Sequence, residues 1–200
     1  MPSPLALDPA RTAVLSMDLQ SFIVAQYAKE PEAFLARVSS VLERARASGI
    51  AVIHVQVGFR PGLPEVSPRN ALFAAIRANP KHQQAFLGPA GAIHPAVAPR
   101  EGDIIVTKHR VSAFAGTDLE MVLRAREIDT LVLFGISTSG VVLSTLLHAS
   151  DADYRLIVLR DCCADLDAEL HSCLLDKFFP HRATVLSSSD FLANLKSASV

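Results

Sequence analysis

The chain has 200 residues and a net charge of −1 at pH 7, with 50% hydrophobic and 20% charged residues. This length and composition suit one globular domain with a sizeable core, so we expect residues 1–200 to form a single domain. The scattered charges exclude the basic face of a nucleic-acid binder, and no apolar run approaches the roughly 18 residues of a membrane span. The N-terminus shows no secretory leader pattern, so we expect a cytoplasmic protein whose partner is a small molecule.

Short apolar runs alternate with helical patterns along the chain, which predicts βαβ units and a parallel sheet. The expected strands are residues 12–17, 50–57, 103–107, 130–135, 155–160 and 183–186. The expected helices are residues 31–48, a stretch capped by Thr117 with Glu120 in a capping box, and residues 140–151, 167–178 and 188–195. Helices on both faces of the sheet would give a three-layer αβα fold.

Residues 58–102 interrupt this alternation. The segment contains seven prolines and several glycines, with a short helical piece near residues 71–78. It is too long for a simple connection between two elements of a compact domain. Excursions of this kind often cover a binding site or form a subunit contact, so we expect a lid-like role.

Three predicted strands end on residues that can carry chemistry. Asp18 follows a strand rich in buried-type residues, Lys108 follows another, and the turn Gly135–Val142 connects a third strand to a helix. Open α/β sheets bind ligands at the carboxyl ends of their strands, so these residues are candidates for one site. Two plainer interpretations stand beside this one: Asp18 could pair with a helix N-terminus, and Lys108 could begin a solvated basic corner.

Five ordered motifs give the chain a resemblance to a known family. They are Asp18-Leu19-Gln20, Ile93-His94-Pro95, Lys108 to Phe114, Gly135 to Thr145 and Asp161 to Ala164. With these motifs the chain resembles the isochorismatase-like hydrolase superfamily, also called cysteine hydrolases, from Arg11 to about Leu195. The resemblance implies a Rossmann-like sheet of six parallel strands in the order 3-2-1-4-5-6, and assembly into a dimer or larger homo-oligomer.

The resemblance also implies roles for individual residues. The family's catalytic acid falls on Asp18 and its lysine on Lys108, whereas its nucleophilic cysteine aligns with Val141. The family's cis peptide bond would join Ile136 to Ser137, and Ser137 and Val141 would then form a turn that binds an oxyanion. The candidate substrate pocket adds Phe22, Phe114, Ser139 and Gly140. Phe22 and Phe114 could equally be ordinary core aromatics.

Other side chains are weaker candidates for the missing nucleophile. Hydroxyls such as those of Ser137, Thr138 and Ser139 more often cap a helix at a turn of this kind, although Ser139 remains an alternative. Cys162, Cys163 and Cys173 are expected to be small reduced residues in or near the core, with the first two beginning the loop after a strand. The seven histidines form no recognisable ligand pair, so we expect no metal and no other cofactor.

Two functions follow from these features. The first is an isochorismatase-family hydrolase that acts on a small molecule without a cysteine nucleophile, with Asp18 as the acid. Cysteine-free isochorismatases, in which the corresponding aspartate protonates a vinyl ether, are the model for this hypothesis. The second is a catalytically silent binding or assembly protein that has kept the pocket. A conventional amidase would need an unrecognised nucleophile and ranks last.

Overall fold

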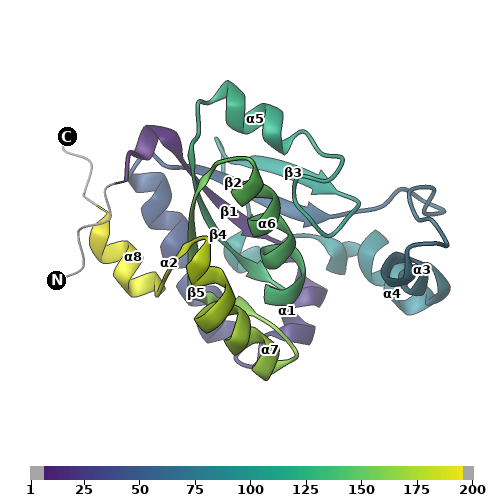
Figure 1. Ribbon diagram of the computed structural model, residues 1–200. Helices are drawn as coiled ribbons and strands as arrows, with labels where there is room; N and C mark the ends of the chain where they lie inside the picture. The colour runs from purple at the N-terminus through teal and green to yellow at the C-terminus, as the bar shows by residue number, and fades with distance from the viewer. Residues whose placement is uncertain (1–6, 196–200) are drawn as a thin grey trace.

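The computed structural model describes residues 7–195 and contains one six-stranded parallel sheet (Figure 1). The strands are β1 (Thr12–Met17), β2 (Ala51–Val57), β3 (Ile104–Lys108), β4 (Thr130–Ile136), β5 (Arg155–Ala164) and β6 (Thr184–Leu186). Their order is β3-β2-β1-β4-β5-β6, and every neighbouring pair is parallel. The predicted fold class and strand order are confirmed.

Helices cover both faces of this sheet. The α-helices are α1 (Ser21–Tyr27), α2 (Pro31–Ala47), α3 (Ala71–Ala78), α4 (Pro80–Leu87), α5 (Leu119–Ala125), α6 (Leu143–Asp151), α7 (Ala168–Cys173) and α8 (Ser188–Asn194). Short 3-10 turns are η1 (Pro9–Arg11), η2 (Pro89–Gly91), η3 (Pro95–Val97) and η6 (Phe179–His181), and π-helical turns are η4 (Thr138–Val142) and η5 (Leu174–Phe178). Helices α2 and α8 lie on one face, and α5, α6 and α7 lie on the other (Figure 1). Within residues 7–195 there is no helix both long and apolar enough to span a membrane.

The centre of the sheet places the end of β1 beside the end of β4. All six residues of β1 are buried, because β2 and β4 flank the strand and helices cover both faces. Gly135 of β4 pairs with Met17, and a Cβ on Gly135 would lie 2.1 Å from the carbonyl oxygen of Met17. Only glycine allows this approach. The turn after β4 therefore lies next to Asp18.

The excursion at residues 58–102 projects from the sheet as the α3–α4 pair (Figure 1). The helix near residues 71–78 is present, but α4 was not predicted, although Asn79 caps it and Pro80 begins it. The end of the excursion returns to the sheet, where Ile93 forms an antiparallel bridge with Gln20. The Gln20 side chain bonds both backbone groups of Val57, so it ties β1, β2 and the excursion together.

Several other boundaries differ from the sequence prediction. Helix α1 was missed, because seven residues carry too little periodicity to distinguish a helix from a loop. Strand β5 continues to Ala164 through a register shift, so Cys162 and Cys163 lie in the strand rather than in a following loop. Asp118 stands at the N-cap position of α5 but makes no side-chain cap bond, whereas Thr117 Oγ1 accepts from the Leu119 N–H at 3.3 Å. Glu120 pairs with Arg124 instead of completing a capping box.

Candidate functional site

Asp18 and Lys108 form a buried ion pair at the carboxyl edge of the sheet. Asp18 follows β1, and Lys108 is the last residue of β3. Lys108 Nζ lies 2.8 Å from Asp18 Oδ2, and the residues are 2% and 6% exposed, respectively. Lys108 also donates to the carbonyl oxygen of Arg110 at 3.0 Å. The two strand ends therefore meet, and Lys108 does not form a solvated corner.

The two carboxylate oxygens of Asp18 have different surroundings. Oδ2 faces Lys108, whereas Oδ1 is buried and has no hydrogen-bond partner among residues 7–195. Burial raises the pKa of Asp18, and the opposing effects of Lys108 and of the nearby Val57 backbone do not cancel this increase. A proton held by this carboxyl group would reside on Oδ1, because Oδ2 accepts from the ammonium group. The geometry is that of a group able to hold or donate a proton.

The turn after β4 contains the other candidate residues. The peptide bond between Ile136 and Ser137 is cis, as the resemblance implied. The chain then enters the π-helical turn η4, whose Ser139 N–H donates to Asp165 Oδ2 at 2.7 Å. Gly140 is tightly placed, because a Cβ there would lie 2.6 Å from Ser137 Oγ.

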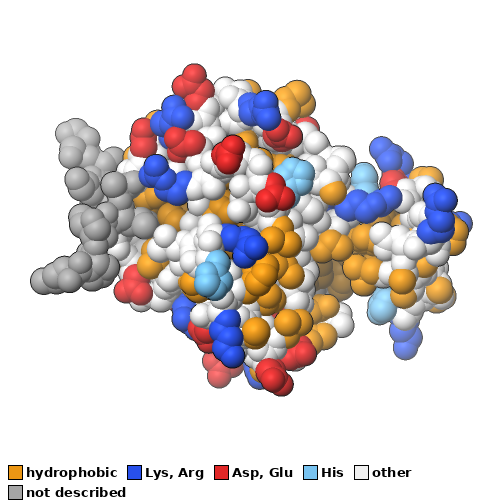
Figure 2. Space-filling model, in the orientation of Figure 1, with side chains coloured by type: hydrophobic (Ala, Val, Ile, Leu, Met, Phe, Trp, Pro, Cys, Tyr) orange, Lys and Arg blue, Asp and Glu red, His pale blue; other side chains and the backbone are white. Residues whose placement is uncertain are grey.

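A cavity of about 410 Å³ lies over Asp18 and the turn, within the range typical of small-molecule sites. Its lining includes seven of the predicted site residues: Asp18, Phe22, Lys108, Ser137, Ser139, Gly140 and Val141. The rest comes mainly from α1, α3 and α4, with Leu72, Phe73 and Phe86 among the apolar side chains. Hydrophobic side chains gather along the junction between the main body and the projecting α3–α4 pair (Figure 2). The excursion therefore supplies one wall of the cavity.

Phe114 does not line this cavity. Its ring stacks on His148 with centroids 4.5 Å apart and planes 2° apart, and the residue is buried in the main core. Phe114 is therefore a core aromatic residue, as the alternative interpretation proposed, and not a residue of the substrate pocket. Phe22, in contrast, reaches the cavity and packs edge-on against Phe86 at 4.7 Å.

The hydroxyls of the turn that reach the cavity lack the basic partner of an activated nucleophile. Ser137 and Ser139 line the cavity, but in residues 7–195 no hydrogen bond joins either hydroxyl to a basic side chain. Thr138 Oγ1 lies 2.8 Å from His171 Nδ1, yet Thr138 is fully buried and is not part of the cavity lining.

The cysteines also lie away from the cavity. Cys162 and Cys163 are buried, and Cys173 is exposed rather than near the core. Burial raises the pKa of the Cys163 thiol to about 12 and that of the Cys162 thiol even further. Thiols of this kind are poor nucleophiles, because the thiolate is the attacking form.

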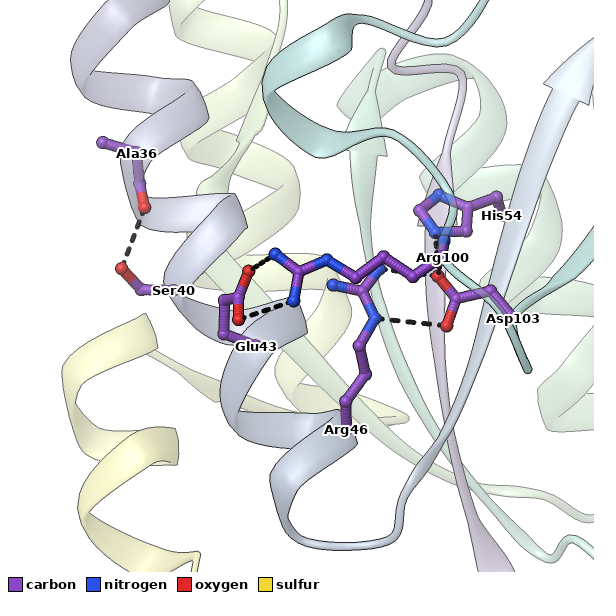
Figure 3. Close-up of polar contacts among 7 residues, drawn as sticks. All are labelled: Ala36, Ser40, Glu43, Arg46, His54, Arg100 and Asp103. Carbon is purple, nitrogen blue, oxygen red and sulfur yellow. Dashed lines mark hydrogen bonds and ion pairs between the residues drawn. The ribbon is translucent and has the colours of Figure 1, made fainter.

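A second buried polar cluster lies at the opposite end of β3 (Figure 3). His54 Nε2 lies 3.1 Å from Asp103 Oδ2, which also accepts from Arg46 at 2.6 Å and from the Arg100 N–H at 2.9 Å. Arg46 Nε donates to the other oxygen of Asp103 at 3.2 Å. Burial lowers the pKa of His54 despite the neighbouring Asp103. Both Asp103 oxygens are therefore satisfied by the protein itself.

Sequence reasoning did not identify three polar residues of the site. Tyr27 and His82 line the cavity, and Asp165 binds the turn beside it. The Ser139 N–H at the start of the turn was a signal that an acidic partner could be present, but nothing in the sequence indicated which acid. Tyr27 and His82 belong to α1 and α4, the two helices that the sequence did not reveal.

The fold and the site define an α/β protein with a buried acid–lysine pair beneath a small-molecule cavity. A family model for the isochorismatase domain matches residues 12–190, so the chain belongs to the isochorismatase family of hydrolases.

Individual relatives support this assignment. Ureidoacrylate amidohydrolase from Rhizobium rhizogenes is 32% identical, over 98% of this chain and 88% of its own. Maleamate amidohydrolase from Pseudomonas putida is 29% identical, over 85% of this chain and 78% of its own. The crystal structure of a cysteine hydrolase from Pseudomonas syringae pv. phaseolicola superposes with a TM-score of 0.86 at 25% identity, with both chains fully covered.

Proposed function

We propose that this protein hydrolyses a small molecule by acid catalysis centred on Asp18, with no covalent intermediate. The observation that carries the proposal is the unpartnered Oδ1 of Asp18, on a buried carboxyl group that lines the cavity. Its raised pKa favours retention of a proton, and general acids work best when their pKa lies near the working pH. Lys108 fixes the other oxygen and thereby orients the group.

Val141 explains why this chemistry is proposed rather than covalent catalysis. We take Val141 to occupy the position of the family's cysteine, and its side chain has no atom that can attack a carbonyl group or accept a proton. Val141 lines the cavity, which retains about 410 Å³ beside it. A small substrate can therefore reach Asp18 past the Val141 side chain.

An enol ether is the substrate class for which acid catalysis alone is sufficient. The proton on Asp18 Oδ1 would move to the terminal alkene carbon, and the ether oxygen would share the positive charge on the neighbouring carbon. Water then adds to that carbon and returns a proton to Asp18. Asp18 then gives its proton to the ether oxygen as the carbon–oxygen bond breaks, and it takes back the proton of the new hydroxyl group. The products are an alcohol and a ketone, so atoms and charge balance.

The second candidate function is a ligand-binding protein without turnover. Val141 favours this second function. It is 2% exposed and lies in the cavity wall, where an apolar side chain can contact a ligand but cannot take part in a reaction. The presence of both Asp18 and Lys108 opposes this function. A buried ion pair often adds little to stability, so a structural role alone does not explain the pair.

Hydrolysis assays on Asp18→Asn test the first proposal. The panel contains small enol ethers and amides. Two of the amides, ureidoacrylate and maleamate, carry a carboxylate and are included because they appear in the names of two relatives. We expect turnover to fall by about 10²–10⁴-fold, the usual contribution of a general acid. Asparagine is compatible with the positive φ of 55° at this position, so the substitution should not strain the backbone. The double variant Asp18→Asn/Lys108→Met controls for the effect of leaving Lys108 without its partner.

Two further measurements separate the candidates. Thiol-alkylating reagents should leave wild-type turnover intact, whereas inactivation would implicate a cysteine and contradict the proposal. Val141→Cys should gain amidase activity if the pocket retains the rest of the family's machinery. If the wild type turns over nothing and only Val141→Cys is active, the binding function replaces the proposed hydrolysis.

A further inference from the structure

Two features of the cavity that could bind an anion are already neutralised by the protein. Lys108 is one of two basic side chains in the lining, and its ammonium group is paired with Asp18 at 2.8 Å. The other feature is the backbone N–H of Ser139, at the start of the turn where unpaired donors ordinarily attract anions. That N–H already donates to Asp165 at 2.7 Å.

The remaining polar groups around the cavity offer no buried positive charge. His82, the second basic residue of the lining, is exposed. Tyr27 stays an uncharged phenol, because burial and the nearby Asp165 raise its pKa. Arg110 lies over the ring of Phe73 and donates to the carbonyl oxygens of His109 and Glu65, and it does not line the cavity.

The walls of the cavity are mainly apolar. Phe22 and Phe86 pack edge to face on one side, and Phe73, Ile76 and Leu72 come from α3. An anion in such surroundings would lose its hydration and gain no unpaired cation, and burial of an uncompensated charge is costly. An uncharged ligand avoids this penalty and can still form one hydrogen bond with Asp18 Oδ1.

We infer that the ligand of this cavity is an uncharged small molecule with an apolar body, and that the cavity discriminates against carboxylates. The inference rests on the proposed function in assigning the ligand to the cavity over Asp18, and it applies to the ionised form of Asp18, in which the charge of Lys108 is compensated. It requires no turnover, so binding measurements can test it separately from catalysis. Asp165 then acts as a specificity-determining residue, because it occupies the donor that a ligand carboxylate would use.

Matched amide and carboxylate probes test this inference directly. The pairs are benzamide with benzoate, hexanamide with hexanoate and cinnamamide with cinnamate, titrated into the wild-type protein at pH 8 by calorimetry or ligand-observed NMR. At this pH each carboxylate probe is fully ionised, and ionisation of Asp18 is favoured relative to lower pH. We expect at least one amide to bind at least about 10-fold more tightly than its carboxylate, equivalent to about 1.4 kcal/mol.

An added cation at the rim should reduce the preference for the amide. Leu72 lines the cavity and is 57% exposed, so Leu72→Arg places a guanidinium group there with little effect on folding. Met121→Arg is the matched control, because Met121 is 67% exposed on α5 and is not part of the lining. Leu72→Arg should increase carboxylate affinity about 5-fold or more, and Met121→Arg should leave it unchanged.

Asp165→Asn tests the role of the occupied turn. Loss of the carboxylate charge weakens the bond with the Ser139 N–H, so carboxylate affinity should rise while amide affinity stays constant. A carboxylate that binds wild type as tightly as its amide, or the absence of amide binding at millimolar concentration, would overturn the inference. Amide binding without hydrolysis of any substrate would instead leave the inference standing and remove the proposed catalysis.

Discussion

The two ends of β3 carry similar buried chemistry with opposite consequences. At its start, Asp103 binds Arg46 and His54, and both carboxylate oxygens have partners within the protein (Figure 3). At its end, Lys108 binds only one oxygen of Asp18, and the other faces no partner among residues 7–195. Whether a buried carboxylate marks a ligand site therefore depends less on its residue type than on whether both of its oxygens have hydrogen-bond partners. A carboxylate whose two oxygens are both satisfied stabilises a fold, whereas an unsatisfied carboxylate oxygen beside a cavity is available for a ligand. His54 Nδ1 also lacks a partner among residues 7–195, but His54 does not line that cavity.

Asp103→Ala should produce the largest loss of stability. The substitution leaves the half-buried Arg46 guanidinium and the buried His54 without their common acceptor. Removal of one partner from a buried charged network typically costs about 3–5 kcal/mol. Urea denaturation at pH 7.5 measures this loss, and a decrease below about 1 kcal/mol would mean that the network is not structural.

Replacement of both members of the site pair should cost less. The double variant Asp18→Asn/Lys108→Met removes both charges together, so no buried ion lacks a partner. We expect a change within about 2 kcal/mol, because buried ion pairs and apolar replacements of similar volume are often close in stability. The same denaturation experiment checks this value. A loss as large as that of Asp103→Ala would make the two ends of β3 equivalent and contradict the comparison.

His54 should make stability depend on pH below neutrality. Its folded pKa is lowered from 6.5, so its contribution to stability is present above pH 6.5 and is lost as pH falls through the folded pKa. The slope for one proton is at most about 1.4 kcal/mol per pH unit. Denaturation of wild type and His54→Asn across this range should show a flatter curve for the variant. Parallel curves would show that His54 is not held neutral by the fold.

Arg100→Ala should have the smallest effect. The Arg100 side chain pairs with Glu43 at an exposed position, whereas the contact with Asp103 uses the Arg100 backbone N–H, which alanine retains. Exposed ion pairs usually contribute about 0–1 kcal/mol. Thermal denaturation in low and high salt would measure this difference. A larger loss would show that the exposed half of the cluster in Figure 3 also supports the fold.

The sheet was predictable from sequence because its strands carry long buried runs, such as β1 and β4, whose residues are all buried. Strand order then placed Asp18 beside Lys108 and the turn after β4. The walls of the cavity were less accessible to prediction. Helices α1 and α4 are seven and eight residues long, and their positions depend on tertiary contacts such as the bridge between Gln20 and Ile93.

Individual side chains show the same limit. Phe22 and Phe114 each follow a site strand by a few residues, yet Phe22 reaches the cavity and Phe114 stacks on His148. Sequence spacing fixes the element on which an aromatic residue lies, but packing determines which neighbours it meets. Asp165 was likewise invisible, because its contact with Ser139 joins residues 26 positions apart.

Titration of the Asp18 carboxyl group tests the central claim most directly. The protein would be labelled with ¹³C at aspartate side chains, and the carboxyl resonances would be followed by NMR as pH is raised. We predict that one aspartate titrates clearly above its ordinary value of 3.8, since burial outweighs the attraction of Lys108, and that its resonance disappears in Asp18→Asn. Asp103→Asn is the matched control, because hydrogen bonds hold the pKa of Asp103 below its ordinary value despite desolvation. An Asp18 pKa at or below 3.8 would contradict the account, since the carboxyl group would then hold no proton to donate.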